Sequence, residues 1–148
     1  GTAIPGALGA GAAAYNRGDE GAPVYTFNTG AANTGVLQSP GVPVPIGTKG
    51  LVLSFDTIRG AEEGISFDQS FVEAREVGEL EWTTLAQIVN QVPCGGTPDV
   101  VTLGFGKKTI APLVGSSIQH RFRFDTIDGA SNSYLGWYVD NVEIRAFP

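Results

Sequence analysis

The sequence predicts an all-β domain, either a sandwich or a barrel, built from short strands separated by turns. The chain has 148 residues, among them 21 glycines and 9 prolines, and only 16% of its residues are charged. Phe, Tyr, Trp, Val, Ile and Thr, which favour strands, recur in short runs between turn-forming clusters. Roughly eight such runs are present and no segment has a convincing helical period, so a helical bundle is excluded.

Apolar and polar residues alternate most regularly in two segments, KGLVLSFDTI at 49–58 and SIQHRFRFDTID at 117–128. Successive side chains of a strand point to opposite faces, so alternation predicts one buried and one solvated face. The expected inward residues are Leu51, Leu53 and Phe55 in the first segment and Ile118, Phe122 and Phe124 in the second, while Gln119, Arg121 and Arg123 face the other way.

The remaining strands are predicted from shorter runs that end at turn residues. The prolines at 40, 43 and 45 break regular pairing and indicate an edge or a crossing segment. The cluster DGASNS at 128–133 is expected to form a turn. Further strands are expected within residues 23–30, 36–47, 66–76, 78–89 and 134–147 and at the start of 96–116.

The N-terminal segment differs in composition from the rest of the chain. Residues 1–14, GTAIPGALGAGAAA, are small and nearly uncharged, which is typical of a leader or linker. The sequence therefore predicts a Gly/Ala-rich leader or assembly arm over 1–23 and one β-sandwich domain over 24–148. Because the chain contains no methionine, we expect it to be a processed or excised piece of a larger precursor.

Charge and hydropathy exclude several classes of partner. The formal net charge is −6 and the pI is about 4.6, whereas nucleic-acid binding needs a basic surface. No apolar run is long enough to cross a bilayer, so no transmembrane segment is expected. Cys94 is the single cysteine, so an internal disulfide is impossible.

Asp140 stands in the middle of the last predicted strand, GWYVDNVEI. It has the same parity as Val142 and Ile144, while Glu143 and Arg145 mark the opposite face as the wetter one. The alternation therefore predicts that Asp140 points inward. A carboxylate in that position costs roughly several kcal/mol unless it is protonated, paired with an arginine or bound to a cation.

Of these three states, a cation suits Asp140 best. Arg121 and Arg123 alternate outward on their own strand, so they are poor partners for an inward carboxylate. A hard cation held by oxygens, with calcium the usual choice, satisfies the charge. The alternative is that Asp140 lies near the sheet rim and accepts hydrogen bonds from the backbone of a loop.

The closing segment RFRFDTIDGASNSYLGWYVDNVEI resembles that of a group of bacterial extracellular jelly-roll domains. This group accompanies secreted metallopeptidases of the immune inhibitor A type, includes adhesin-like modules, and is similar to MAM-like and choice-of-anchor-like domains. The upstream pieces LQSP, LVLSFDT, EEGISFDQSFVEA and EWTTL resemble the same group in the same order. The resemblance runs from about residue 24 to 147 and implies a two-sheet antiparallel β-sandwich of jelly-roll type, without catalytic activity.

The resemblance also implies a structural calcium site. It places Asp140 at the family's C-terminal calcium aspartate and Asp68 at the aspartate before a Val-x-Val strand, with Glu62 or Glu63 in the acidic loop before that. Three features depart from the family pattern. Asn141 replaces a second aspartate, GELE replaces an Asp-Gly-Gly turn, and the cysteines of MAM domains are missing.

The sequence shows no feature that favours an enzyme. His120 is the only histidine and has the inward parity of its strand, as expected for a structural residue. No Gly-x-Ser-x-Gly elbow accompanies it, and the presence of only one histidine and one cysteine argues against a zinc site. Cys94 lies in a predicted loop without a second thiol. We therefore predict a protein that is not an enzyme.

Two functions follow as hypotheses. In the first, the chain is a secreted, calcium-stabilised module for adhesion or for binding a glycan or cell-surface protein. Tyr134, Trp82 and Trp137 are then the candidate ligand-binding aromatics, although both tryptophans also suit the core. In the second, the chain is a subunit of an extracellular filament or matrix, which donates its N-terminal segment to a sheet of a neighbouring copy.

Overall fold

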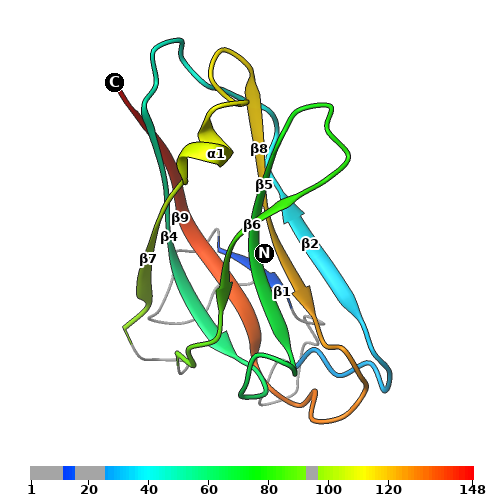
Figure 1. The fold of residues 1–148 in the computed structure, drawn as a ribbon. Coiled ribbons are helices and arrows are strands. Elements are labelled where there is room, and N and C mark those ends of the chain that lie inside the picture. The colour runs from blue at the N-terminus through cyan, green and yellow to red at the C-terminus, as the bar shows by residue number, and fades with distance from the viewer. Residues whose placement is uncertain (1–11, 16–25, 93–96) are drawn as a thin grey trace.

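The computed structural model describes residues 12–15, 26–92 and 97–148, which form two antiparallel sheets packed face to face (Figure 1). The first sheet has four strands in the order β1-β9-β4-β7, and the second has five, in the order β2-β8-β5-β6 with β3 also paired to β8. The strands are β1 (Ala13–Tyr15), β2 (Thr34–Gln38), β3 (Val42–Pro43), β4 (Gly50–Gly60), β5 (Gln69–Glu76), β6 (Thr83–Ile88), β7 (Asp99–Gly104), β8 (Ser117–Asp125) and β9 (Gly136–Phe147), and α1 is a short helix at Lys107–Ile110.

The connectivity is that of a jelly roll. Along the chain, β1, β4, β7 and β9 belong to the first sheet, and β2, β5, β6 and β8 to the second. All pairings between these strands are antiparallel. The predicted two-sheet β-sandwich of jelly-roll type is therefore confirmed.

The core lies between the sheets and is built from the alternating residues of β4 and β8. Leu51, Leu53 and Phe55 are buried on the inner face of β4, as the alternation predicts. Phe55 meets Phe122 of β8 edge to face, with ring centroids 4.9 Å apart. The short helix α1 lies at one end of the sandwich (Figure 1). Leu113, which follows the helix in the chain, is buried in the same core.

The first part of the predicted domain differs from the expectation. The described part of the strand expected within 23–30, residues 26–30, contains no strand, whereas β2 at Thr34–Gln38 and β3 at Val42–Pro43 overlap the strand expected within 36–47. Three residues of the segment assigned to the leader, Ala13–Tyr15, pair with β9 in the first sheet. Ala12, just before them, is buried, and the other residues of that segment lie outside the described part of the chain.

Tyr15 is held where β1 meets the second sheet. Its ring lies 4.7 Å from that of Phe124, and its hydroxyl donates to Oδ1 of Asn33. A Cβ at Gly35 would lie 2.2 Å from Cε2 of Tyr15, so this close approach requires glycine at position 35.

A β-bulge in β9 reverses the parity on which the prediction for Asp140 depended. Ser54 of β4 pairs with Glu143, but the next register pair is Asp56 with Asp140, so β9 contains one extra residue. Asn141, within the bulge, has a φ of 50°. The inward face of β9 is therefore formed by Trp137 and Val139 before the bulge and by Ile144 after it.

The prediction that Asp140 points inward is corrected accordingly. Asp140 lies opposite Asp56, which alternates with the inward residues of β4, and cross-strand partners share a face. Asp140 is half-buried on the outer face of the first sheet, and its Oδ1 accepts the backbone N–H of Asn141 at 2.8 Å. The single extra residue is the physical reason, because it shifts every later side chain to the opposite face.

Candidate functional site

Two loops meet at the end of the sandwich opposite α1 (Figure 1). Residues 61–68 connect β4 to β5, and residues 126–135 connect β8 to β9. The last residue of β4 pairs with the first of β9, and Gln69 at the start of β5 pairs with Asp125 at the end of β8. These registers bring both loops to the same edge.

Arg59, at the end of β4, stabilises the end of the first loop through hydrogen bonds. Its side chain is 1% exposed and donates from Nε to Oγ of Ser70 at 2.9 Å and from Nη2 to the carbonyl of Asp68 at 2.6 Å. Burial lowers the pKa of Arg59, while the negative charge of Asp68 opposes that effect. The buried guanidinium therefore fixes the backbone of Asp68 and supplies one positive charge beneath the loop.

Asp68 is buried with half of its carboxylate unsatisfied. It is 1% exposed, and Oδ2 accepts the backbone N–H of Glu62 at 2.7 Å. Its Oδ1 is buried and has no hydrogen-bond partner among the described residues. Burial is the largest cause that raises the pKa of Asp68; the Glu62 N–H and Arg59 oppose it, and the charges of Glu62 and Asp128 add to it.

Asn132, in the second loop, repeats this arrangement. It is 1% exposed, and its Nδ2 donates to the carbonyl of Asp128 at 3.1 Å. Its Oδ1 is also buried without a partner in the part of the chain that the structure describes. The loop is folded tightly around it, since Asp128 Oδ1 accepts the N–H of Ala130 at 2.8 Å.

Two observations relate the two loops. The charge of Asp128 helps to raise the pKa of Asp68, and a Cβ at Gly60, the last residue of β4, would lie 3.0 Å from Cβ of Leu135 in the second loop. Two buried acceptor oxygens without donors therefore belong to adjoining loops, together with the carboxylates of Glu62 and Asp128. We call Glu62, Asp68, Asp128 and Asn132 the loop-end oxygen cluster.

The chemistry of the loop-end oxygen cluster suits a hard cation. Buried acceptors are nearly always satisfied, so two orphaned oxygens in one region need an explanation. Calcium takes six to eight oxygen ligands, including carboxylates, amide oxygens, carbonyls and water. Within residues 12–15, 26–92 and 97–148, no group of three or more His, Cys, Asp or Glu side chains is arranged to hold a metal ion. A cation here would therefore need amide, main-chain or water oxygens as well.

The structure separates the residues that the resemblance assigned to calcium. Asp68 and Glu62 lie together in the cluster, and Glu63 is exposed beside them. Asp140 lies four positions along β9 from Gly136, which is roughly 13 Å at the rise of a strand, on the outer face of the first sheet. A role of Asp140 as a calcium ligand stays a prediction. The inward placement that motivated this prediction is not present, because Asp140 lies on the outer face of the sheet.

Sequence reasoning missed Asp128 and Asn132. Both lie in DGASNS, which the sequence analysis treats only as a turn. The available signal was the pair of oxygen-bearing residues, Asp128 and Asn132, in the loop between β8 and β9. It could not be connected with Asp68 until the pairing of β5 with β8 was known, because that pairing brings the loop to the same edge as Asp68.

The candidate ligand-binding aromatics have three different environments. Tyr134 is 43% exposed and lines an open hollow with Glu62, Glu63 and Gln91 beside the cluster. Trp137 is 3% exposed and packs against Phe122 in the core, so its ring presents no surface to a ligand. Trp82 is half-buried and lies outside the core, where it contacts two arginines.

His120 has the inward placement that its parity predicts. It is 9% exposed, packs edge to face on Phe122, and its Nδ1 is buried with no partner among the described residues. Burial lowers the pKa of His120, so the neutral imidazole is favoured. Cys94 lies outside the described residues.

Neither a family model nor a curated protein matches the chain. The resemblance to the jelly-roll domains described above therefore stays a prediction. Among the residues that the structure describes, no helix is long and apolar enough to cross a membrane.

Proposed function

We propose that the chain is a non-catalytic, extracellular β-sandwich module for adhesion or for binding a glycan or cell surface, stabilised by calcium at its loop end. The observation that carries the calcium proposal is the pair of orphaned buried oxygens, Oδ1 of Asp68 and Oδ1 of Asn132. The module character is supported by the jelly-roll fold and by the resemblance of the closing segment to secreted adhesin-like domains.

The charge balance of the cluster is compatible with one divalent cation. Asp68, Glu62 and Asp128 contribute three negative charges, and buried Arg59 contributes one positive charge. Without a cation, burial of the Asp68 carboxylate is unfavourable, as the raised pKa of Asp68 indicates. Calcium that binds to the folded state and not to the unfolded chain would stabilise the domain by mass action.

The test is a thermal melt with calcium and with a chelator. At calcium a hundredfold above its dissociation constant, binding adds about 2.7 kcal/mol. For a domain of this size that corresponds to an increase of roughly 5–10 °C in melting temperature. Direct binding is measured in parallel by isothermal titration of the same protein.

Two isosteric variants locate the site. Asp68→Asn removes a charge from the loop-end oxygen cluster and should abolish most of the calcium-dependent increase, whereas Asp140→Asn should retain it. An increase that survives Asp68→Asn and disappears in Asp140→Asn would place the cation at Asp140 and contradict the loop-end site. A wild-type protein that neither binds calcium nor melts at a higher temperature with it contradicts the proposal.

The second candidate, self-assembly by strand donation, is supported by one feature of the first sheet. β1 pairs with Trp137–Val139, and over residues 141–147 no other strand in the described part of the chain pairs with that edge of β9. An unpaired edge is a template for strand addition. Light scattering of the full chain over a range of concentrations tests this, and a monomer at every concentration contradicts it.

A further inference from the structure

The outer face of the second sheet carries an arginine cluster in an otherwise acidic protein. Arg121 and Arg123 alternate outward on β8, and Arg75 does so on β5. The register places Arg121 opposite Glu73, Arg123 opposite Phe71 and Arg75 opposite Gln119. We call Arg75, Arg121, Arg123, Phe71 and Trp82 the arginine–aromatic face.

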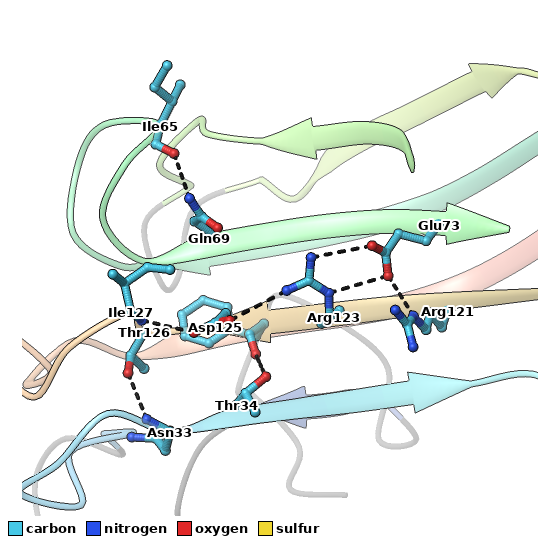
Figure 2. Close-up of polar contacts among 11 residues, drawn as sticks. Asn33, Thr34, Ile65, Gln69, Glu73, Arg121, Arg123, Asp125, Thr126 and Ile127 are labelled. Carbon is cyan, nitrogen blue, oxygen red and sulfur yellow. Dashed lines mark hydrogen bonds and ion pairs between the residues drawn. The ribbon is translucent and has the colours of Figure 1, made fainter. Parts of the chain in front are cut away.

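One buried carboxylate organises the centre of this face (Figure 2). Arg121 donates from Nε to Oε2 of Glu73 at 2.5 Å, and Arg123 donates from Nη2 to Oε1 at 3.3 Å. The Glu73 side chain is 6% exposed, whereas those of Arg121 and Arg123 are 20% and 26% exposed. The solvent-facing charge at the centre is therefore that of the guanidinium groups.

Aromatic rings hold the guanidinium groups in place. The Cζ atoms of Arg75 and Arg121 lie 4.3 Å and 4.2 Å from the centroid of the Trp82 ring, and that of Arg123 lies 4.4 Å from Phe71. Stacking uses the flat surface of a guanidinium and leaves its in-plane N–H donors available. Trp82, a candidate ligand residue by sequence, thus positions arginines.

Arg121 has hydrogen-bond donors that no described residue accepts. Its Nε bonds to Glu73, but its terminal Nη1 and Nη2 make no hydrogen bond with any residue that the structure describes. Arg123 is more fully used, because its Nη1 also contacts Oδ2 of Asp125 at 3.5 Å. The two free terminal nitrogens of Arg121 form the fork that matches the two oxygens of a carboxylate or sulfate.

The face carries both positive and negative charges. Arg121 and Arg123 pair with Glu73 and Asp125, in a chain whose net charge is −6. Arg75 is bordered by Glu79 and Glu81. The donors left without an acceptor among the described residues are therefore the terminal nitrogens of Arg121, and a single such group favours a ligand with separated negative charges over a densely charged one.

We infer that the arginine–aromatic face binds an acidic polysaccharide, with Arg121 as the main contact to its carboxylate or sulfate groups. This inference rests on the proposed function of a binding module and names its partner. A sheet face accommodates an extended chain, and side-chain amides suit sugar hydroxyls. Gln38 lies opposite Arg121, and Gln87 lies opposite Phe71. Nucleic acid is disfavoured because its phosphates require many more cations.

The experiment titrates the full chain with chondroitin sulfate, which carries a carboxylate and a sulfate on each disaccharide, in the presence of calcium. Dextran serves as the neutral control and polyglutamate as the acidic peptide. Binding to chondroitin sulfate should persist at about 0.15 M salt and weaken as salt is added, because exposed charges are screened. Equal binding of dextran or of polyglutamate would overturn the inference, as would the absence of binding to chondroitin sulfate.

Three variants test the assigned residues. Arg121→Gln should weaken binding about tenfold or more, since a charge-assisted hydrogen bond is lost. Trp82→Leu keeps every charge and should weaken binding less, by releasing the guanidinium groups. Arg145→Gln is the matched control, because Arg145 is an exposed arginine paired with Glu143 on the other sheet, and it should bind as the wild type does. If Arg145→Gln weakens binding as much as Arg121→Gln, the attraction is non-specific and the inference fails.

The calcium melt separates this inference from the proposed function. Each variant is first melted with calcium and with chelator to show that it is folded. A calcium-dependent melting temperature without polysaccharide binding removes this inference alone. Polysaccharide binding that depends on Arg121, without any calcium effect, removes the calcium site and keeps the inference.

Discussion

Asn141 donates its side-chain amide to Oδ2 of Asp56 at 2.7 Å, directly across the bulge that separates β9 into two registers. Asn141 also has a φ of 50°, which asparagine tolerates better than most residues. Replacement by leucine would lose the hydrogen bond and add backbone strain. We expect Asn141→Leu to lower the free energy of unfolding in urea by about 1–2 kcal/mol. Asn141→Gly, which adopts this φ freely, should cost less, and an equal loss in both variants would contradict the role of strain.

The indole N–H of Trp137 donates to Oγ1 of Thr57 at 2.8 Å, and both residues are buried. Thr57→Val keeps the shape of the side chain but leaves the indole N–H without an acceptor. We expect a loss of about 1–3 kcal/mol in the free energy of unfolding. Thr57→Ser retains the hydroxyl and is the control. A loss no larger in the valine variant than in the serine variant would show that the hydrogen bond contributes little.

His120 should make the domain less stable as the pH falls below 7. Burial lowers its pKa in the folded state, so the unfolded chain binds a proton more readily. The stability present above the unfolded pKa of about 6.5 is lost as the pH falls below that value. Asp68 acts in the opposite direction because burial raises its pKa. Urea titrations between pH 5 and pH 7 should therefore show a smaller pH dependence in His120→Leu, and an unchanged dependence would exclude His120 as the cause.

Ile127 should tolerate a more polar residue with a gain in stability. It has a φ of 62°, which is strained for a β-branched side chain, and its side chain is 48% exposed. Asparagine adopts this conformation with less backbone strain. The substitution also removes little buried apolar surface, because the isoleucine side chain is already half exposed. We expect Ile127→Asn to raise the free energy of unfolding by about 1 kcal/mol. Ile65→Asn is the control at an exposed isoleucine outside this φ region, and a gain of the same size there would exclude backbone strain as the cause.

The fold was predictable because its signals are local. The alternation in β4 and β8 is visible in the order of their apolar residues. The six inward residues that it predicts are all buried in the structure, namely Leu51, Leu53, Phe55, Ile118, Phe122 and Phe124. The first strand was not predictable, since Ala13–Tyr15 gains strand structure only by pairing with the distant β9. Small residues such as Ala13 and Ala14 carry no strand signal of their own.

The candidate site was predictable in part. Asp68 and Glu62 lie close together in the sequence and in the structure. Asp140 was assigned to the interior on the assumption of unbroken alternation, which the bulge at Asn141 violates. A bulge of one residue has no clear sequence signature, yet it changes the face of every residue beyond it.

The sequence by itself determined the strand-rich composition, the inward residues of the regular strands and the acidic charge of the whole chain. These properties follow from residue type and from the two-residue period of a strand. Only the tertiary structure decided which loops share an edge, so that the charge of Asp128 acts on Asp68, and which side chains share one sheet face, so that Arg75 and Arg121 contact Trp82. Those relationships depend on the pairing of strands far apart in the sequence, which residue order alone does not encode locally.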